Sequence, residues 1–289
     1  MVTLLVPKTD EIVFNHLLNI IKEQEWTSKH YKELLNLFNM CDSREQHALL
    51  DDLISRFEVL NGEQESEAYS HINTFIQQEK LSPDTTLIVG CGDVGRSIDG
   101  SIVGLQKMKS RLEPRGKWEC RMSQNIHELM AVLSNNKTVI IFDDFIGSGK
   151  KILEKFYWLQ KSVNGDDNID FDSIDVIFAS LAGMEFGIDR IKKETNCKVV
   201  SYLCLKKGIT DHYPADEVNQ KLLLMKQLES KLNDHFDNRA LVEFSLGYSQ
   251  SETLYFAEND NCPNNVFPIF WWQKLTNEDT HGTLLYRSD

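Results

Sequence analysis

The sequence predicts an α/β fold in which a parallel sheet is flanked by helices, with a helical cap before it. Four short apolar runs alternate with amphipathic helical stretches between residues 85 and 205. Alternation of this kind predicts βαβ units and a mostly parallel sheet. The runs are apolar at almost every position, as expected for strands that helices cover on both faces.

The N-terminal region, residues 1–80, shows helical patterns only. Apolar residues recur at intervals of three and four in several stretches, and Asp42 or Ser43 is a candidate cap for one of these helices. Pro83, in the stretch LSPDT, closes the region, because proline disfavours helix in the residue before it.

The predicted core, residues 81–214, contains the alternating elements. We expect strands at 85–90, 137–142, 174–183 and 197–205, and helices near 97–111, 149–162 and 184–195. The C-terminal part, residues 215–289, begins with a helix and returns to strand-like runs at 252–259 and 266–272.

The composition argues against several classes of function and location. The net charge of −13 argues against a broad nucleic-acid-binding face, since phosphate contacts need clustered lysine and arginine. The six cysteines form no CxxC pair, which favours a reducing, cytoplasmic location. No apolar run is long enough to span a membrane, and the N-terminus does not look like a signal peptide.

The stretch KTVIIFDDFIGSGKKILEKF, residues 137–156, joins a buried strand to a helix through two carboxylates and a glycine-rich loop. Buried carboxylates are costly unless they meet water, a cation or hydrogen-bond donors, and vicinal ribose hydroxyls are such donors. The loop enters a helix start, where free backbone N–H groups and the helix dipole favour an anion. Asp143 and Asp144 followed by the loop 147–149 therefore fit a sugar phosphate, held at its hydroxyls and at its phosphate.

Other interpretations of these stretches stay open. A solvated strand end with a glycine-lined turn needs no ligand at all. A P-loop would need GxxxxGK[ST], but Asp144 replaces its first glycine and Lys151 replaces its serine or threonine. GCGDVG, residues 90–95, matches the GxGxxG of dinucleotide-binding units, yet no convincing second strand with an acidic end follows, and Glu119 is a weak candidate.

The run of four apolar residues, two aspartates, three further residues and Ser-Gly resembles the signature with which type I phosphoribosyltransferases bind phosphoribosyl pyrophosphate (PRPP). The chain more specifically resembles phosphoribosyltransferase-like proteins encoded in bacterial conflict and anti-phage systems, including some retron operons. Those proteins carry stretches close to FDDFIGSGK, to LGYSQSETLYFAENDNCPNNVFPIFW and to a terminal LLYR. The resemblance covers residues 85–289.

This resemblance implies roles by position. Asp143 and Asp144 would bind the ribose hydroxyls and, through ligand or water, Mg²⁺, which usually keeps several waters; with Arg96 they are the catalytic candidates. The 5-phosphate would be held by Gly147, Ser148, Gly149, Lys150 and Lys151. The pyrophosphate loop would comprise Gly92, Asp93, Val94, Gly95, Arg96 and Ser97.

The sequence also departs from the family pattern. Family enzymes usually end the phosphate loop in Gly-Gly-Thr or similar, whereas Lys150 and Lys151 stand there. No base pocket can be identified, so the acceptor stays open. Six basic residues fall where such enzymes have a mobile flap, although a solvated helix end and loop would look the same: Lys107, Lys109, Arg111, Arg115, Lys117 and Arg121.

The resemblance also implies that the C-terminal part, residues 215–289, forms a hood beside the sheet that covers the acceptor, and the candidates there have two interpretations each. Asn264 and Asn265 can contact the acceptor or cap turns. Trp271 and Trp272 can stack on a ring or seal the core. His212, after the last core strand, lies either near the site edge or in an ordinary loop.

The resemblance implies an effector that acts on PRPP or a nucleotide in anti-phage defence and is toxic when released from protein or ribonucleoprotein partners. Two alternatives from other classes stay open. The chain could be a binding module that senses a nucleotide or PRPP without chemistry, or a structural subunit of a defence complex. Fold-level resemblance alone does not choose between them.

Overall fold

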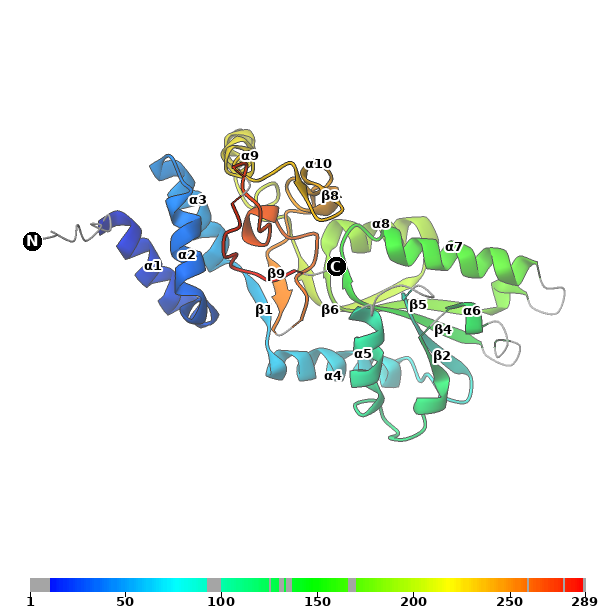
Figure 1. Cartoon of the computed structure of the whole chain (residues 1–289). Coiled ribbons are helices and arrows are strands. Elements are labelled where there is room, and N and C mark those ends of the chain that lie inside the picture. Colours follow the sequence, from blue (N-terminus) through cyan, green and yellow to red (C-terminus); the bar gives the residue numbers. More distant parts are fainter. Residues whose placement is uncertain are drawn as a thin grey trace, which may run out of the picture. The chain divides into compact units, whose positions relative to one another are not determined.

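The computed structural model of the chain describes residues 11–92, 100–124, 126–129, 133, 137–165, 170–258, 260–277 and 279–287. It contains two compact units, which are treated separately below (Figure 1). The sheet unit comprises Leu60–Lys206, and the terminal unit comprises the described residues up to Val59 and from Lys207 onwards. Helix α4 (Gly62–Gln78), which the sequence placed with the N-terminal helices, belongs to the sheet unit.

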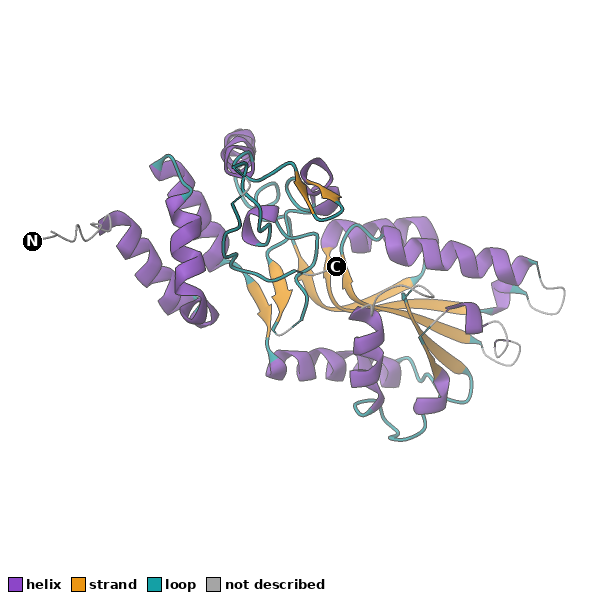
Figure 2. Ribbon diagram, viewed as in Figure 1, coloured by secondary structure: helices purple, strands orange, loops and turns teal. Residues whose placement is uncertain are grey.

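A five-stranded sheet forms the centre of the sheet unit, and Figure 2 shows its strands in orange. All neighbouring strands are parallel, which confirms the predicted fold class. Leu87 lies opposite Val139, which in turn lies opposite Val176. The strand order is β3-β2-β4-β5-β6, with β2 (Thr86–Gly90), β3 (Met122–Ser123), β4 (Thr138–Ile146), β5 (Asp175–Met184) and β6 (Lys198–Leu205).

Helices cover both faces of this sheet (Figure 1). Because strand side chains alternate between faces, Val139 and Ile141 pack with Phe156 on one side, while Phe142 points to the other. There Gly104 leaves room for the Phe142 ring, since a Cβ at Gly104 would lie 2.5 Å from the ring atom Cε1. Besides α4, the helices are α5 (Gly100–Lys109), η2 (Glu119–Arg121), α6 (Ile126–Leu129), α7 (Lys150–Asn164), η4 (Phe171–Ser173) and α8 (Glu185–Thr195).

The terminal unit has a separate apolar core, to which both of its chain segments contribute. Ser43 caps one of the predicted helices, because its Oγ accepts a hydrogen bond from the N–H of Gln46 at 3.2 Å. The elements before the sheet unit are α1 (Glu11–Glu23), η1 (Glu25–His30), α2 (Tyr31–Asn39), α3 (Arg44–Ser55) and β1 (Glu58–Leu60). Those after it are α9 (Ala215–Glu229), β7 (His235–Phe236), β8 (Arg239–Ala240), α10 (Leu241–Phe244), η5 (Tyr248–Gln250), β9 (Tyr255–Ala257) and η6 (Pro268–Phe270).

Two of the strand-like runs near the C-terminus differ from the prediction. The run 266–272 is not a strand; it contains the short helix η6, in which Pro268 has no N–H to give to a sheet. The run 252–259 contributes only β9, which pairs with β1. Both runs are apolar because they fill the core, and an apolar run alone does not distinguish a buried strand from other buried backbone.

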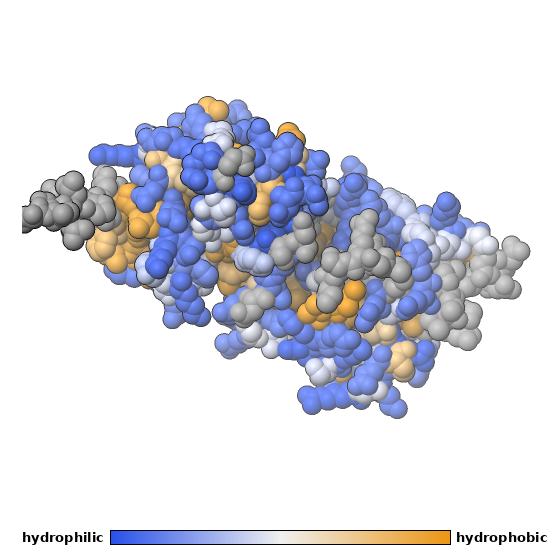
Figure 3. Space-filling model, in the orientation of Figure 1, coloured by the Kyte–Doolittle hydropathy of each residue, from blue (hydrophilic) through white to orange (hydrophobic). Residues whose placement is uncertain are grey.

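Apolar side chains also reach the surface of the terminal unit, and orange atoms gather in Figure 3 where Figure 1 labels α1. Phe14 and Leu18 on this helix are exposed, whereas Val13 and Ile20 on its other side are buried in the core. Among the residues that the structure describes, no helix combines the length and the apolar character needed to cross a membrane.

Candidate functional site

The sheet unit contains a topological switch point between β2 and β4. From β2 the chain turns to β3 on one side, and it then crosses to β4 on the other side. In open α/β sheets, ligands bind at such a point, outside the carboxyl ends of the strands. The segments that follow Gly90 and Ile146 both start at this edge, and the N–H of Cys91 donates to the carbonyl of Phe142 at 3.1 Å. The two predicted ligand loops therefore start at the same edge of the sheet, although β4 continues to Ile146 before its loop begins.

Asp143 and Asp144 lie within β4, whereas the sequence placed them after its end. The strand extends to Ile146 because β5 continues beside it, with Asp143 opposite Ser180 and Ile146 opposite Gly183. Side chains of successive strand residues point to opposite faces of the sheet. The two carboxylates therefore reach different helices.

The carboxylate of Asp143 points to α7, on the same side as Ile141. Its side chain is only 4% exposed, and its Oδ1 accepts a hydrogen bond from the Nζ of Lys151 at 2.8 Å. A buried carboxylate stays charged only where a cation or donors compensate for lost water. Lys151, at 43% exposure, supplies that cation from the first turn of α7.

The carboxylate of Asp144 points to α5, on the side of Phe142. A Cβ at Gly100 would lie 2.3 Å from Oδ2 of Asp144, so the acid lies directly against the first residue of this helix. The N-terminal end of a helix favours negative charge through its dipole and its unpaired N–H groups. A larger residue at position 100 would overlap the carboxylate unless the Asp144 side chain moved.

The loop 147–149 leads from β4 into α7. Gly149 is the N-cap of the helix and has φ +76°, a left-handed conformation that favours glycine. The first N–H groups of a helix have no partner within it, and together with the dipole they form a general site for anions. No acidic residue stands in the first turn of α7, whereas Lys150 and Lys151 both do. The loop therefore has the charge and the backbone of a phosphate site.

Helix α8 packs against this loop and holds it in position. A Cβ at Gly187 would lie 2.0 Å from the carbonyl oxygen of Gly147, and one at Gly149 would lie 2.9 Å from the carbonyl oxygen of Gly187. The Nη1 of Arg190 donates to the carbonyl of Ser148 at 3.4 Å. Arg190 also donates a hydrogen bond to the carboxylate of Glu194 at 2.8 Å. This bond, and to a smaller extent a hydrogen bond from the hydroxyl of Tyr157, lowers the pKa of the Glu194 carboxyl. This support could not be predicted from the sequence, since it depends on the packing of α8.

The family model PRTase-CE matches residues 7–280. The chain belongs to the PRTase-CE family. It is therefore phosphoribosyltransferase-like, as the resemblance indicated. Among solved structures it is similar to the orotate phosphoribosyltransferase from Aeropyrum pernix, at 13% identity over 54% of this chain and 74% of that chain, with a TM-score of 0.30. No curated protein matches it.

The predicted pyrophosphate loop of this PRTase-CE chain is described only at its start. A Cβ at Gly92 would lie 2.8 Å from Cδ1 of Ile102, so Gly92 packs closely against α5. The roles assigned to this loop stay predictions. Five of its residues lie outside the described part of the chain: Asp93, Val94, Gly95, Arg96 and Ser97.

Part of the predicted basic flap makes structural contacts. The Nζ of Lys107 pairs with Glu65 of α4 at 2.7 Å. Arg111 donates to the carbonyl of Lys107 at 2.7 Å, and its guanidinium lies 4.9 Å from the ring centroid of Tyr69. Arg115 instead forms an exposed pair with Glu113. These contacts fit a packed helix end better than a row of cations held ready for a ligand.

In the terminal unit, the predicted hood residues form hydrogen bonds with a neighbouring segment of the same unit. The Nδ2 of Asn265 donates to the carbonyl of Tyr248 at 3.2 Å and to the Oγ of Ser251 at 2.8 Å. Asn264 accepts from the N–H of Tyr248 through its main-chain carbonyl, at 2.9 Å. The segment so held has positive φ at Leu246, Gly247, Ser249, Gln250 and Glu252. Trp271 and Trp272 are fully buried in the core.

Sequence reasoning missed a charged cluster near His212. Asp52 accepts hydrogen bonds from Arg56 at 2.5 Å and from the hydroxyl of Tyr213, and the Nε2 of His212 lies 3.9 Å from its other oxygen. Burial alone would raise the pKa of Asp52, but the bonds from Arg56 and Tyr213 outweigh it and lower the pKa. Asp52 and Arg56 are four residues apart, a spacing that predicts an ion pair between them on a helix. It does not predict the contacts of Asp52 with Tyr213 and His212, which lie far away in the sequence.

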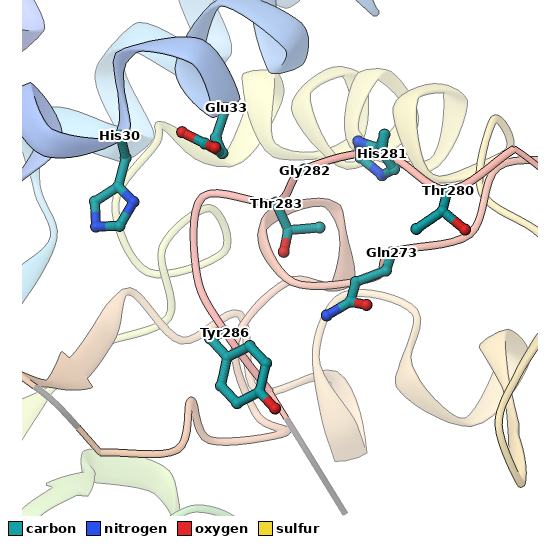
Figure 4. A pocket seen from close by; sticks show the side chains of 8 residues that line it. All are labelled: His30, Glu33, Gln273, Thr280, His281, Gly282, Thr283 and Tyr286. Carbon is teal, nitrogen blue, oxygen red and sulfur yellow. The ribbon is translucent and has the colours of Figure 1, made fainter.

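The terminal unit also contains a cavity of about 410 Å³, shown in Figure 4. Polar side chains dominate its lining, and Glu33 is its only acidic member. The ring of His281 lies half-buried there, where burial lowers its pKa and its Nε2 bonds the carbonyl of Trp272 at 2.9 Å. The lining residues are His30, Glu33, Gln273, Thr280, His281, Gly282, Thr283 and Tyr286.

The predicted Mg²⁺ stays a prediction. Among the described residues, no group of three or more histidine, cysteine, aspartate or glutamate side chains could hold a metal ion. Mg²⁺ usually binds through one or two carboxylates together with substrate phosphates and water, so Asp143 and Asp144 stay its candidate residues.

Proposed function

We propose that the sheet unit binds the phosphate and the ribose of PRPP or of a nucleotide. The observation that carries this proposal is the junction of β4 and α7. There a left-handed Gly149 opens the helix, Lys151 adds an ammonium group, and Asp143 lies 2.8 Å from that ammonium. Amides and a cation suit the phosphate, and a carboxylate suits the hydroxyls.

As an enzyme, the chain would transfer or cleave a pentosyl group at C1 of the ribose. The residues of this chain bind and orient the sugar: the loop 147–149 fixes the phosphate, and the carboxylate of Asp143 accepts from the hydroxyls. Fixing both ends restricts where C1 lies relative to an incoming acceptor, which lowers the entropic part of the barrier. Mg²⁺ carried by the ligand would neutralise charge on the departing pyrophosphate.

In the cell, we propose that the chain acts in the bacterial cytoplasm as an effector of anti-phage defence and is toxic when released from its partners. This rests on the resemblance of two stretches, FDDFIGSGK and the one that ends in VFPIFW, to proteins of such systems. All six cysteines lie among the described residues, and none of them forms a disulfide there.

A second candidate function is a sensor that binds PRPP or a nucleotide without turnover. The departure of the phosphate loop from the family pattern favours it, because Lys150 and Lys151 stand where family enzymes usually end the loop in Gly-Gly-Thr or similar. The two functions share a binding step and differ in chemistry. Pyrophosphate release, measured with a range of bases and nucleotides, distinguishes them.

The binding step is tested by calorimetry with PRPP and with ribose 5-phosphate, in the presence and absence of Mg²⁺. Gly149→Ala should weaken binding about tenfold or more, because its Cβ would lie 2.9 Å from the carbonyl of Gly187 at a left-handed position. Gly116→Ala is the matched control: Gly116 has φ +73° and nothing within 4 Å of a Cβ. Equal affinities for the two variants would contradict the proposal that the loop 147–149 binds the phosphate.

The cellular proposal is tested by expression of the chain without partner genes. Growth arrest that Asp143→Asn abolishes, at equal protein level, is the expected result. Healthy growth at high expression of the unaltered chain would overturn the toxic role and leave the binding site to be judged by calorimetry.

A further inference from the structure

We infer that the cavity of the terminal unit binds a guanidinium group, carried either by a small molecule or by an arginine side chain of a protein partner. The cavity has a volume of about 410 Å³, within the range of roughly 300–1,000 Å³ that is usual for small-ligand sites. All of its lining residues belong to the terminal unit, so the inference does not depend on the sheet unit or on the function proposed for it.

Two segments that are far apart in the sequence supply the lining, as Figure 4 shows. His30 and Glu33 come from η1 and α2, and the other lining residues come from the segment 273–286. That segment is held by its own main chain, because the N–H of His281 donates to the carbonyl of Gln273 at 3.0 Å. The backbone that carries the lining is thus fixed by contacts within the unit and needs no ligand to form.

Glu33 gives the cavity its negative charge. No lysine or arginine belongs to the lining, and Glu33 has no hydrogen bond or ion pair among the residues that the structure describes. Its side chain is half-buried and packs against Gly282, where a Cβ would lie 3.2 Å from Cγ and 3.4 Å from Oε1 of Glu33. A carboxylate that has lost part of its water and has no partner favours a cation as ligand.

His281 and Gln273 add uncharged acceptors on the other segment. The carbonyl of Trp272 can only accept, so the Nε2 of His281 carries the proton of their 2.9 Å hydrogen bond. Burial lowers the pKa of His281, so its ring is uncharged at about pH 7 and its Nδ1 keeps a lone pair. The side-chain oxygen of Gln273 accepts no hydrogen bond within the described part of the chain.

A guanidinium group matches these acceptors better than an ammonium group does. It is planar and presents five N–H donors in a fixed fork, so it can bond a carboxylate through two parallel bonds and still reach acceptors on its other side. An ammonium group has three donors and holds its water more strongly. The ring of Tyr286, which also lines the cavity and is 67% exposed, offers an aromatic face to a planar cation.

A water-filled hollow that takes any small polar molecule is the competing explanation, and a neutral isostere distinguishes the two. n-Butylurea has the shape of n-butylguanidinium, but it carries no charge and has an oxygen in place of one NH₂ group. If Glu33 selects a cation, the urea loses the charge-assisted bonds and places an acceptor against an acceptor. If the hollow takes any polar molecule, the two compounds bind alike.

The experiment is calorimetry on the full chain with n-butylguanidinium, n-butylurea and n-butylammonium. The guanidinium should bind about tenfold or more tightly than the urea and about threefold or more tightly than the ammonium. Equal affinities for the guanidinium and the urea, or no measurable heat with the guanidinium, would overturn the inference. This comparison uses the unaltered chain, so it needs no variant to fold.

Glu33→Gln tests the carboxylate itself. It keeps the size of the side chain and should weaken binding of n-butylguanidinium about tenfold. Glu23→Gln is the matched control, because Glu23 is an exposed carboxyl on α1 outside the lining, and its loss should change the affinity less than about twofold. Thermal unfolding checks that both variants fold. An unchanged affinity in Glu33→Gln, or an equal loss in both variants, would contradict a site built on Glu33.

A short peptide separates the two sources of the guanidinium group. Acetyl-Gly-Arg-Gly-amide should bind, and the same peptide with citrulline in place of arginine should bind about tenfold or more weakly. A peptide affinity well above that of n-butylguanidinium supports an arginine of a protein partner, whereas equal affinities support a small guanidine. Equal binding of the arginine and citrulline peptides would count against the site in either form.

Discussion

The backbone of Gly187 in α8 lies against the carbonyl oxygen of Gly147, so closely that a Cβ at Gly187 would stand 2.0 Å from that oxygen. No side chain fits at this distance. The first turn of α8 thereby fixes the position of the loop 147–149, whose backbone has the features of an anion site. The position of the loop is thus determined by a helix that the sequence places nearly forty residues later.

The first prediction concerns Gly187→Ala. In a helix interior this change normally stabilises by about 1 kcal/mol, since glycine is a poor helix former. Here it should instead destabilise by about 1–3 kcal/mol and weaken phosphate binding about tenfold, because the loop has to shift away from the new methyl group. Thermal unfolding and calorimetry with inorganic phosphate measure the two effects.

Gly165→Ala provides the control for that change. Gly165 follows α7 with φ −91°, and the nearest atoms to a Cβ there would be 3.6 Å away. It should alter stability by less than about 1 kcal/mol and leave phosphate affinity unchanged. Equal behaviour of the two alanine variants would show that α8 does not hold the loop.

The second prediction concerns Arg190→Met. The guanidinium of Arg190 bonds the carbonyl of Ser148 at 3.4 Å and is about half exposed, so its contribution to folding is small. The variant should keep its stability within about 0.5 kcal/mol and lose about two- to fivefold in phosphate affinity. Lys193→Met removes an exposed charge from the same helix. A loss of the same size in both would indicate a general charge effect rather than positioning of the loop.

The third prediction separates the two interpretations of Asn265. Its buried amide bonds the carbonyl of Tyr248 and the hydroxyl of Ser251, in a segment with several left-handed residues. Asn265→Ala should therefore cost about 1–3 kcal/mol of stability, measured by urea unfolding. Asn264→Ala should cost less than about 1 kcal/mol, because Asn264 bonds Tyr248 only through its main chain. Lost ligand affinity at unchanged stability in Asn265→Ala would favour acceptor contact instead.

The fourth prediction is a pH dependence that originates at Glu229. Burial raises the pKa of this carboxyl from 4.5 to about 7, although hydrogen bonds from Ser245 and Leu246 oppose the rise. Since the folded state binds the proton more tightly, the stability from this group is complete below pH 4.5 and is lost as the pH rises to about 7. The full span corresponds to roughly 3 kcal/mol.

Glu229→Gln removes this dependence, and its amide keeps both partners: Oε1 can accept from the N–H of Leu246, while Nε2 can donate to the Oγ of Ser245. Its unfolding free energy, followed by urea titration from pH 5 to pH 8, should fall less steeply with pH than that of the unaltered chain. Glu243→Gln, an exposed carboxyl on α10, should leave the slope as it is. Parallel slopes for the unaltered chain and Glu229→Gln would contradict the prediction.

The sequence was sufficient for the architecture of the sheet unit. The apolar runs that became β2, β4, β5 and β6, and the helical spacing between them, predicted a parallel sheet with helices on both faces, and the strand pairing confirms it. It did not reveal β3, because two paired residues leave no periodic pattern. It also predicted a strand at 266–272, where burial on all sides produces the same apolar composition.

The sequence by itself determined that two acids, a glycine turn and two lysines follow one another, since those are properties of neighbours along the chain. Only the tertiary structure decided what they face. Pairing with β5 carried the strand past Asp144, and the two-residue repeat of a strand then sent Asp143 to Lys151 and Asp144 to Gly100. Where a strand ends depends on its partner strand, and so the direction of a side chain is settled by contacts far away in the sequence.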